Sequence, residues 1–181
     1  YPFLFGLSIN TFLPAFNTDV LKGGADDLGF LMTAMGVGAI AGSLLLARFA
    51  SAPHKGYWVI GSSAAWGLML ALFAVTETYI YVVIFIGLIG FLSAVNMSMN
   101  RSLMQLQVAP SMRGRIMSID MMAHGLMPLG ILPIGYIAEH YSVSAGLATS
   151  GLVLFLITAV SAIFMPKIRA INSGYPDENA E

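Results

Sequence analysis

Two ionisable side chains lie one helical turn apart within a long, nearly uncharged stretch of the chain. Asp120 and His124 are four residues apart, so they share one face of a helix. An ionisable group inside an apolar span is energetically expensive and usually faces a cavity or a partner. Because an imidazole titrates near neutral pH, the pair predicts a site of proton coupling. The sequence also permits a second interpretation, in which Asp120 lies near an interface and pairs with Arg115 or Arg101.

Side-chain amides and hydroxyls recur at helical spacing earlier in the chain. Ser93, Asn96, Asn100 and Gln107 are separated by three, four and seven residues, which places them on one stripe of a helix. Such a stripe either lines a water-filled substrate cavity or forms hydrogen bonds with neighbouring membrane helices, and the pattern leaves both open. Asn10, close to Phe12, is a further candidate. We therefore expect a substrate cavity at Asn10, Phe12, Ser93, Asn96 and Asn100.

Small residues and prolines mark positions of close packing or bending. Ala34, Gly38 and Gly42 recur every four residues, a spacing that favours close contact between two membrane helices. A later segment alternates glycine with proline, at Gly125, Pro128, Gly130, Pro133 and Gly135. Proline removes a backbone hydrogen bond and bends a helix. This segment is either a kinked packing helix or a hinge that moves during a transport cycle.

Enzyme chemistry is not predicted. Gly61-Ser62-Ser63-Ala64 and His124 offer the serine and histidine of an intramembrane protease of the rhomboid type, but the expected Gly-x-Ser-Gly motif fails at Ala64. A serine nucleophile also needs a base within hydrogen-bond reach and an oxyanion hole. The chain has no cysteine, phosphate-binding loop or His/Glu metal spacing. We expect no metal and no cofactor.

The elements that position these residues are six apolar stretches. The chain is 57% hydrophobic and only 9% charged, with a mean hydropathy of +0.81, which is far too apolar for a water-exposed domain. A membrane-spanning helix needs about 20 apolar residues. An all-α membrane protein is predicted, with six helices in a bundle over residues 1–169 and a disordered cytoplasmic tail at 170–181. The expected helices are 2–20, 28–49, 56–75, 79–108, 112–139 and 143–165.

The cations separate the two sides of the membrane. Seven of the eight Lys and Arg residues lie in alternate gaps or after the last span, and Lys22 alone lies on the other side. Lys and Arg accumulate on cytoplasmic loops, so the carboxy terminus is predicted to be cytoplasmic. The chain has no basic patch that indicates nucleic acid, and its expected surroundings are a lipid bilayer. The seven residues are Arg48, Lys55, Arg101, Arg113, Arg115, Lys167 and Arg169.

The junction from Asn100 to Ser118 resembles the region between helices ten and eleven of major facilitator superfamily transporters. Arg101 and the Arg113-Gly114-Arg115 segment carry the most specific part of this likeness. Residues 13–21 and 28–39 are similar to helices seven and eight of the same proteins. The likeness is to the branch of drug and siderophore exporters that includes enterobactin-exporter-like proteins, also described as transmembrane secretion effectors.

This resemblance implies the carboxy-terminal half of a twelve-helix transporter, built from two inverted three-helix repeats. The first, second, fourth and fifth helices would face the cavity, and the third and sixth would pack outside. Two features depart from the family pattern. The loop after the second helix keeps only Gly42, Arg48 and Lys55 of the usual motif, and the glycine and proline spacing differs from that of exporter helices. The direction of transport therefore stays open.

The predicted function is proton-driven export of a small amphipathic molecule, such as a drug or siderophore, by alternating access. The protein would act in the cytoplasmic (inner) membrane of a bacterium, with a missing amino-terminal half as its partner and protons as the coupling ion. The alternative is a six-helix membrane scaffold that transports nothing, or a half-transporter that pairs with itself.

Overall fold

The computed structural model describes residues 2–48, 55–106 and 110–164, and every regular element within these ranges is helical. The predicted all-α fold is therefore confirmed. The predicted tail at 170–181 lies outside the described residues. The helices are α1 (Pro2–Gly6), α2 (Ser8–Asp19), α3 (Ala25–Arg48), α4 (Lys55–Ala74), α5 (Tyr79–Leu106), the short 3-10 helix η1 (Pro110–Met112), α6 (Arg113–Gly125), α7 (Met127–His140) and α8 (Val143–Phe164).

Two of the stretches expected as single helices are divided. The stretch at 2–20 breaks at Leu7 into α1 and α2, and the stretch at 112–139 breaks at Leu126 into α6 and α7. At both breaks the backbone tightens into hydrogen bonds between residues three apart, from the Asn10 N–H to the Leu7 carbonyl (3.1 Å) and from the Leu129 N–H to the Leu126 carbonyl (3.0 Å). Pro128 follows the second break, whereas the first break has no adjacent proline.

The first break is tied to α8 by two hydroxyls. Ser8 Oγ and Ser150 Oγ lie 2.8 Å apart, and both donate to the Phe5 carbonyl, at 2.7 Å and 2.6 Å. Ser8 and Ser150 are fully buried, so these bonds lie in the interior of the bundle. The backbone acceptor near the break is thereby satisfied without water, as a membrane protein requires.

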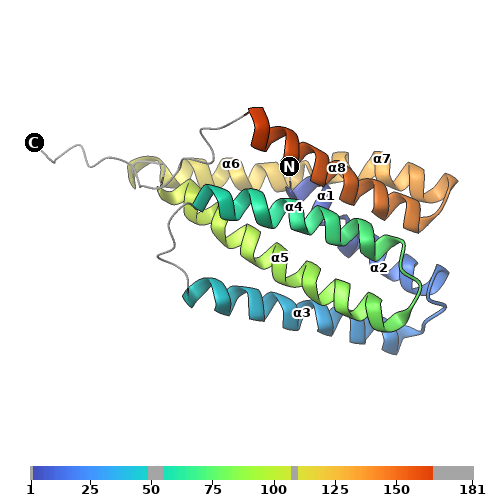
Figure 1. Cartoon of the computed structure of the whole chain (residues 1–181). Helices are drawn as coiled ribbons and strands as arrows, with labels where there is room; N and C mark the ends of the chain where they lie inside the picture. The colour runs from blue at the N-terminus through green and yellow to red at the C-terminus, as the bar shows by residue number, and fades with distance from the viewer. Residues whose placement is uncertain (1, 49–54, 107–109, 165–181) are drawn as a thin grey trace, which may run out of the picture.

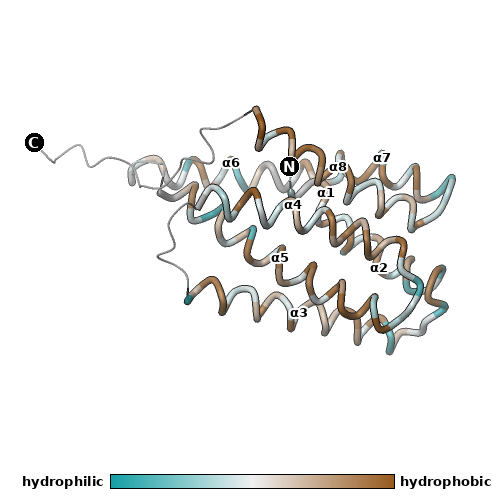
Figure 2. The backbone as a smooth tube through the Cα atoms, viewed as in Figure 1, coloured by the Kyte–Doolittle hydropathy of each residue, from teal (hydrophilic) through white to brown (hydrophobic). Residues whose placement is uncertain are grey.

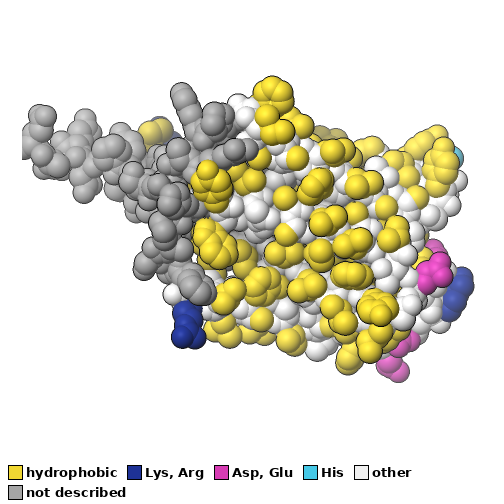
Figure 3. Space-filling view, viewed as in Figure 1, with side chains coloured by type: hydrophobic (Ala, Val, Ile, Leu, Met, Phe, Trp, Pro, Cys, Tyr) yellow, Lys and Arg dark blue, Asp and Glu magenta, His cyan; other side chains and the backbone are white. Residues whose placement is uncertain are grey.

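Within the described residues, five segments are long and apolar enough to cross a membrane: α3, α4, α5, the α6–α7 pair and α8. The 24 residues of α3 extend roughly 36 Å at 1.5 Å per residue, which exceeds the hydrocarbon thickness of about 30 Å. Hydrophobic side chains cover the visible face of the molecule, and charged side chains gather toward its two ends (Figure 3). An apolar surface of this extent is suited to lipid rather than to water.

The helices lie side by side in one bundle, and helices distant in the sequence pack together (Figure 1). Helix α3 packs against α5, α5 against α4, α4 against α8, and α8 against α7. The short helices α1 and α2 pack on α8, α7, α4 and α3. Apolar residues run along the lengths of the helices, and hydrophilic residues concentrate at the turns between them (Figure 2).

Glycines allow the closest helix contacts. On α3, Gly38 lies against the Gly87 carbonyl of α5, and a Cβ added to Gly42 would be 2.5 Å from the Phe91 carbonyl oxygen. A second seam joins α4 to α8, where an added Cβ on Gly151 would be 2.6 Å from the Gly67 carbonyl oxygen and from the Ala71 nitrogen. Any larger side chain at these positions would force the two backbones apart.

Candidate functional site

One pocket brings together polar residues from three helices near the middle of the bundle. It has a volume of about 170 Å³ and lies between α2, α3, α4 and α5. We call it the central pocket, and its polar side chains are Asn10, Trp66 and Ser93. Trp66 and Ser93 lie close to the midpoints of α4 and α5, and Met35 holds the same position on α3.

Asn10 and Ser93, both predicted at a cavity, meet in this pocket although they are far apart in the sequence. Asn10 is exposed on α2, and Pro14 has no N–H to donate to the Asn10 carbonyl four residues before it. The Ser93 hydroxyl donates to the Gly90 carbonyl of its own helix at 2.8 Å. The pocket is therefore lined by a residue with an exposed side-chain amide, and the backbone carbonyl of that residue lacks its usual helical donor.

Trp66 is the pocket residue that sequence reasoning missed. Its side chain is fully buried, with 0% of its surface exposed, and its ring packs directly on Gly6, where an added Cβ would be 2.7 Å from Cζ2. Among the described residues, no acceptor lies within hydrogen-bond distance of its indole Nε1. Tryptophan in membrane proteins concentrates at the interfaces, so a tryptophan at the centre of an apolar span is the signal that could have identified it.

Asn96 has a different environment from the other predicted cavity residues. It is fully buried, and its Nδ2, which has two protons to donate, lies within hydrogen-bond distance of three acceptors on α4. These are the Val59 carbonyl (3.1 Å), Ser62 Oγ (3.0 Å) and Ser63 Oγ (2.6 Å). This arrangement corresponds to the helix-contact alternative that the sequence left open. Ser62 and Ser63, considered above as a nucleophile, both serve this contact.

The remaining cavity candidates lie elsewhere. The Phe12 ring lies against α7, with its Cζ 3.8 Å from a Cβ position built on Gly135. Asn100 is half-buried on α5, and Gln107 is outside the described residues. Neither Phe12 nor Asn100 is among the described residues that line the central pocket.

The pair expected to couple protons lies on α6. Asp120 is half-buried there, and His124 follows one turn later, with a side chain outside the part that the structure describes. Helix α6 contributes no described residue to the central pocket. Proton coupling by this pair stays a prediction.

The basic junction lies at one end of the bundle, where α5 ends and α6 begins. Arg101, Gly114 and Arg115 are exposed, and the Arg113 side chain is not described. The Ser118 hydroxyl donates to the Gly114 carbonyl at 2.9 Å, within the first turns of α6.

The predicted hinge residues surround the second helix break. Gly125 ends α6, Pro128 is in the first turn of α7, Gly130 is buried in α7 and Pro133 lies inside it. The structure thus places an interruption of the helix at Leu126, between Gly125 and Pro128. Movement at this break stays a prediction.

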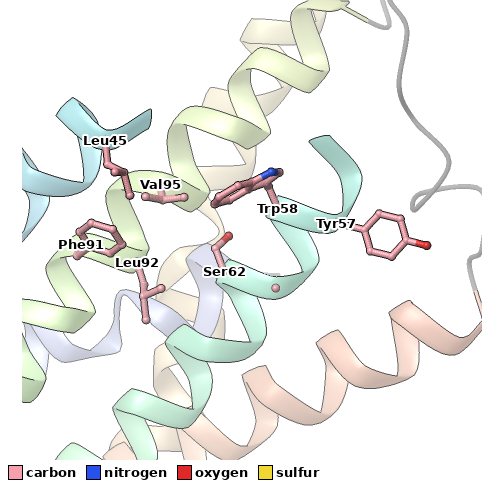
Figure 4. A pocket seen from close by; sticks show the side chains of 8 residues that line it. Leu45, Tyr57, Trp58, Ser62, Phe91, Leu92 and Val95 are labelled. Atoms are coloured by element: carbon pink, nitrogen blue, oxygen red, sulfur yellow. The ribbon is translucent and has the colours of Figure 1, made fainter. Parts of the chain in front are cut away.

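A second cavity, of about 370 Å³, lies between α3, α4 and α5 nearer to the ends of the helices. Leu45, Trp58, Phe91 and Val95 line it, with Ser62 at its wall (Figure 4). The Tyr57 ring points away from this group (Figure 4). Its described lining includes no side-chain amide, whereas Asn10 contributes one to the central pocket.

Comparisons with known proteins agree on the class of protein. The family model described as transmembrane secretion effector matches residues 2–178. The chain is 29% identical over 164 residues to the staphyloferrin A transporter of Staphylococcus aureus, covering 91% of this chain and 41% of the relative. It is 32% identical over 92 residues to the enterobactin exporter EntS of Shigella boydii serotype 18, covering 51% of this chain and 22% of the relative. No solved structure gives a significant match.

The chain thus spans less than half the length of these curated relatives. The family match, in contrast, extends over nearly all of the chain, including the two interrupted helices and the basic junction. Together with the apolar, all-helical bundle, this match shows that the chain belongs to the transmembrane secretion effector family of major facilitator superfamily transporters.

Proposed function

We propose that the chain is one six-helix half of a secondary transporter that exports a small amphipathic molecule of the siderophore class. The observation that carries this proposal is the central pocket, where Asn10, Trp66 and Ser93 converge from three helices. Transporters of this kind bind substrate near the bilayer midplane, at the interface between repeats and beside interrupted helices. The pocket lies next to such an interruption, because Leu7 lines it.

The exposure of α3 supports a missing second half. Along its 24 residues only Leu31 and Gly42 are buried, because α3 packs on α5 along one face and leaves its other faces exposed among the described residues. A pocket of about 170 Å³ is also smaller than the roughly 300–1,000 Å³ of most ligand sites. The other half would cover α3 and supply the remainder of the substrate site.

The charges at the ends of the bundle support one orientation. Arg48, Arg101 and Arg115 lie where α3 and α5 end and α6 begins, whereas Asp26 and Asp27 begin α3. Cytoplasmic loops are rich in Lys and Arg. The arginine-rich end would thus face the cytoplasm of a bacterium, and the carboxy terminus would lie on the same side.

The relatives support the substrate class, since one is named a staphyloferrin A transporter and others are named enterobactin exporters. For proton coupling, Asp120 and His124 on α6 are the candidates. They precede the break at Leu126, so a change in their protonation would act on a helix that is already interrupted.

The test uses the full-length protein in proteoliposomes with an imposed pH gradient. We expect movement of staphyloferrin A or enterobactin that depends on the gradient. His124→Gln should reduce this dependence at least tenfold and leave movement down a substrate gradient intact, while Ser118→Ala on the same helix should change neither. Failure of the wild type to move either siderophore under either gradient would overturn the proposal.

A further inference from the structure

The second cavity, between α3, α4 and α5, is accessible from outside the bundle. At its rim Leu45 is 40% exposed and Trp58 is 39% exposed, whereas Val95 at its base is only 4% exposed. The Trp58 ring extends toward Val95 (Figure 4). The volume of about 370 Å³ falls within the range of roughly 300–1,000 Å³ that is typical of ligand sites. Unlike the central pocket, this cavity is large enough to hold a ligand by itself.

The second cavity lies on the opposite side of α3 from the central pocket. Gly36 lines the central pocket and Leu45 lines the second cavity. These residues are nine positions apart, so they point about 180° away from each other on a helix of 3.6 residues per turn. Substrate sites of such transporters lie between repeats, so the missing half is expected on the side of the central pocket. The second cavity would then face the surrounding lipid.

The lining residues also indicate how the cavity lies within the bilayer. Tyr57 and Trp58 are in the first turn of α4 and are 55% and 39% exposed. Tyrosine and tryptophan concentrate at the level of the lipid headgroups. Phe91, which also lines the cavity, lies close to the midpoint of α5. The cavity thus extends from the headgroup level toward the bilayer centre, which is the course of an acyl chain in one leaflet.

Positive charge is present at the headgroup end of the cavity, and negative charge is not. Arg48, the last residue of α3, is exposed and lies three residues after Leu45, so the two share a helix face. Lys55 begins α4. Between residues 28 and 119 the only acidic residue is Glu77, which precedes α5 at the opposite end of the bundle. The stretches that line the cavity therefore supply no carboxylate near Arg48.

We propose that the second cavity binds one acyl chain of a phospholipid whose anionic headgroup pairs with Arg48. The chain lies against Leu45, Phe91 and Val95, and the guanidinium donates to the phosphate oxygens. Basic sites between membrane helices bind anionic headgroups, and each Lys or Arg near the surface contributes about fivefold in affinity. This inference uses the proposed function only to place the missing half, and it adds a lipid ligand that is not the transported molecule.

The test uses the full-length protein in phosphatidylcholine vesicles that contain added lipid with brominated chains. Bromine quenches tryptophan fluorescence on contact, and the difference between each protein and its Trp58→Phe version isolates the signal of Trp58. We expect brominated phosphatidylglycerol to quench this signal at about fivefold lower mole fraction than brominated phosphatidylcholine. Arg48→Gln should abolish the preference. Arg115→Gln removes the same charge at the same end of the bundle, on α6, and should retain it.

A second variant tests the chain rather than the headgroup. Gly61 lines the cavity, and nothing lies within 4 Å of a Cβ position built on it, so Gly61→Leu fills the space without a clash at Cβ. This variant should abolish the preference for phosphatidylglycerol although Arg48 is retained. Gly29→Leu is the matched control, because its Cβ position on α3 is equally open and it does not line the cavity.

Equal quenching by the two lipids in the wild type would overturn the inference, as would an unchanged preference in Arg48→Gln or Gly61→Leu. Quenching by neither lipid would show that protein covers the cavity, which also excludes a lipid there. Glycerol phosphate, the headgroup without chains, should not displace the lipid, and displacement would indicate a site for soluble anions instead.

Lipid binding and transport can fail separately. If the wild type exports no siderophore but prefers phosphatidylglycerol at Trp58, the proposed function fails and the lipid site remains. If the wild type exports staphyloferrin A and shows no lipid preference, the lipid site is disproved and the transporter stands.

Discussion

Two polar clusters share helix α5 and have opposite surroundings. Asn96 lies in a dry contact, fully buried and bonded to the α4 residues Val59, Ser62 and Ser63. Ser93, only three residues earlier, lines the open central pocket with Asn10. Two polar residues three positions apart on α5 thus have different roles: Asn96 joins two helices, and Ser93 borders a pocket. The role of each residue depends on what its side chain faces and not on its being polar.

The close packing around α4 explains the dry side of this comparison. Helix α4 lies between α5 and α8, and the Gly67–Gly151 contact brings α8 to backbone distance. The pocket side is bordered instead by Leu7, at the break between α1 and α2, and by Ile9 and Asn10 of α2. The pocket therefore lies beside an interrupted helix, whereas the dry contact lies between two continuous ones.

The largest effect is expected at a glycine contact where two helices approach to backbone distance. Gly151→Val would place a side chain where a Cβ alone is 2.6 Å from the α4 backbone, so α4 and α8 must separate. We expect a loss of about 3 kcal/mol or more in the free energy of unfolding, at the upper end of overpacking effects. The measurement is denaturant unfolding of the full-length protein in detergent micelles.

Gly61→Ala is the matched control on α4, because nothing lies within 4 Å of its Cβ position. It should leave the unfolding free energy unchanged or slightly raised, since alanine is the better helix former. If both variants were equally stable, the close contact between α4 and α8 would not be a source of stability.

A moderate effect is expected at Asn96, and it should be confined to stability. Asn96→Ala removes the hydrogen bonds to α4, and interhelical hydrogen bonds in membranes contribute about 0.6 kcal/mol on average and at most about 1.7. The same unfolding assay should show a loss of about 1 kcal/mol. Siderophore affinity should not change. Ser98→Ala, at an exposed position on α5, is the control. A large loss of affinity in Asn96→Ala would mean that this residue contacts substrate after all.

The smallest free-energy effect is expected at Asn10, and it should appear only in binding. Asn10→Ala removes an exposed amide, so unfolding should be unaffected, whereas siderophore affinity should fall about threefold, equivalent to about 0.6 kcal/mol. Thr149→Ala, on α8, is the control, because its hydroxyl donates to the Ala145 carbonyl of its own helix. Titration of the full-length protein with staphyloferrin A, followed by calorimetry, provides the measurement. Unchanged affinity would remove Asn10 from the site.

The apolar runs and their flanking charges sufficed to predict the fold class, because lipid imposes both helix and length. They did not suffice to predict the break at Leu7, where no proline lies beside the interruption and Gly6 accommodates the Trp66 ring. Helical periodicity also predicted that Ser93 and Asn96 lie on the same stripe of a helix and share one role. Three residues advance a helix by about 300°, so the two side chains point about 60° apart, which suffices to face different neighbours.

Trp66 shows a further limit of sequence reasoning. A tryptophan within an apolar run adds to the hydrophobic pattern, and periodicity records nothing about its N–H. Only the packed structure shows that the ring lies against Gly6 and that its N–H has no described acceptor within hydrogen-bond distance.

The Ser150 hydroxyl links two helices from opposite ends of the described chain. Its bond to the Phe5 carbonyl joins α1 to α8 within the buried interior, just before the helix break at Leu7. Leu7, Ile9 and Asn10, at and after this break, form one wall of the central pocket. The position of this wall is therefore coupled to that of α8, a helix that contributes no described residue to the pocket.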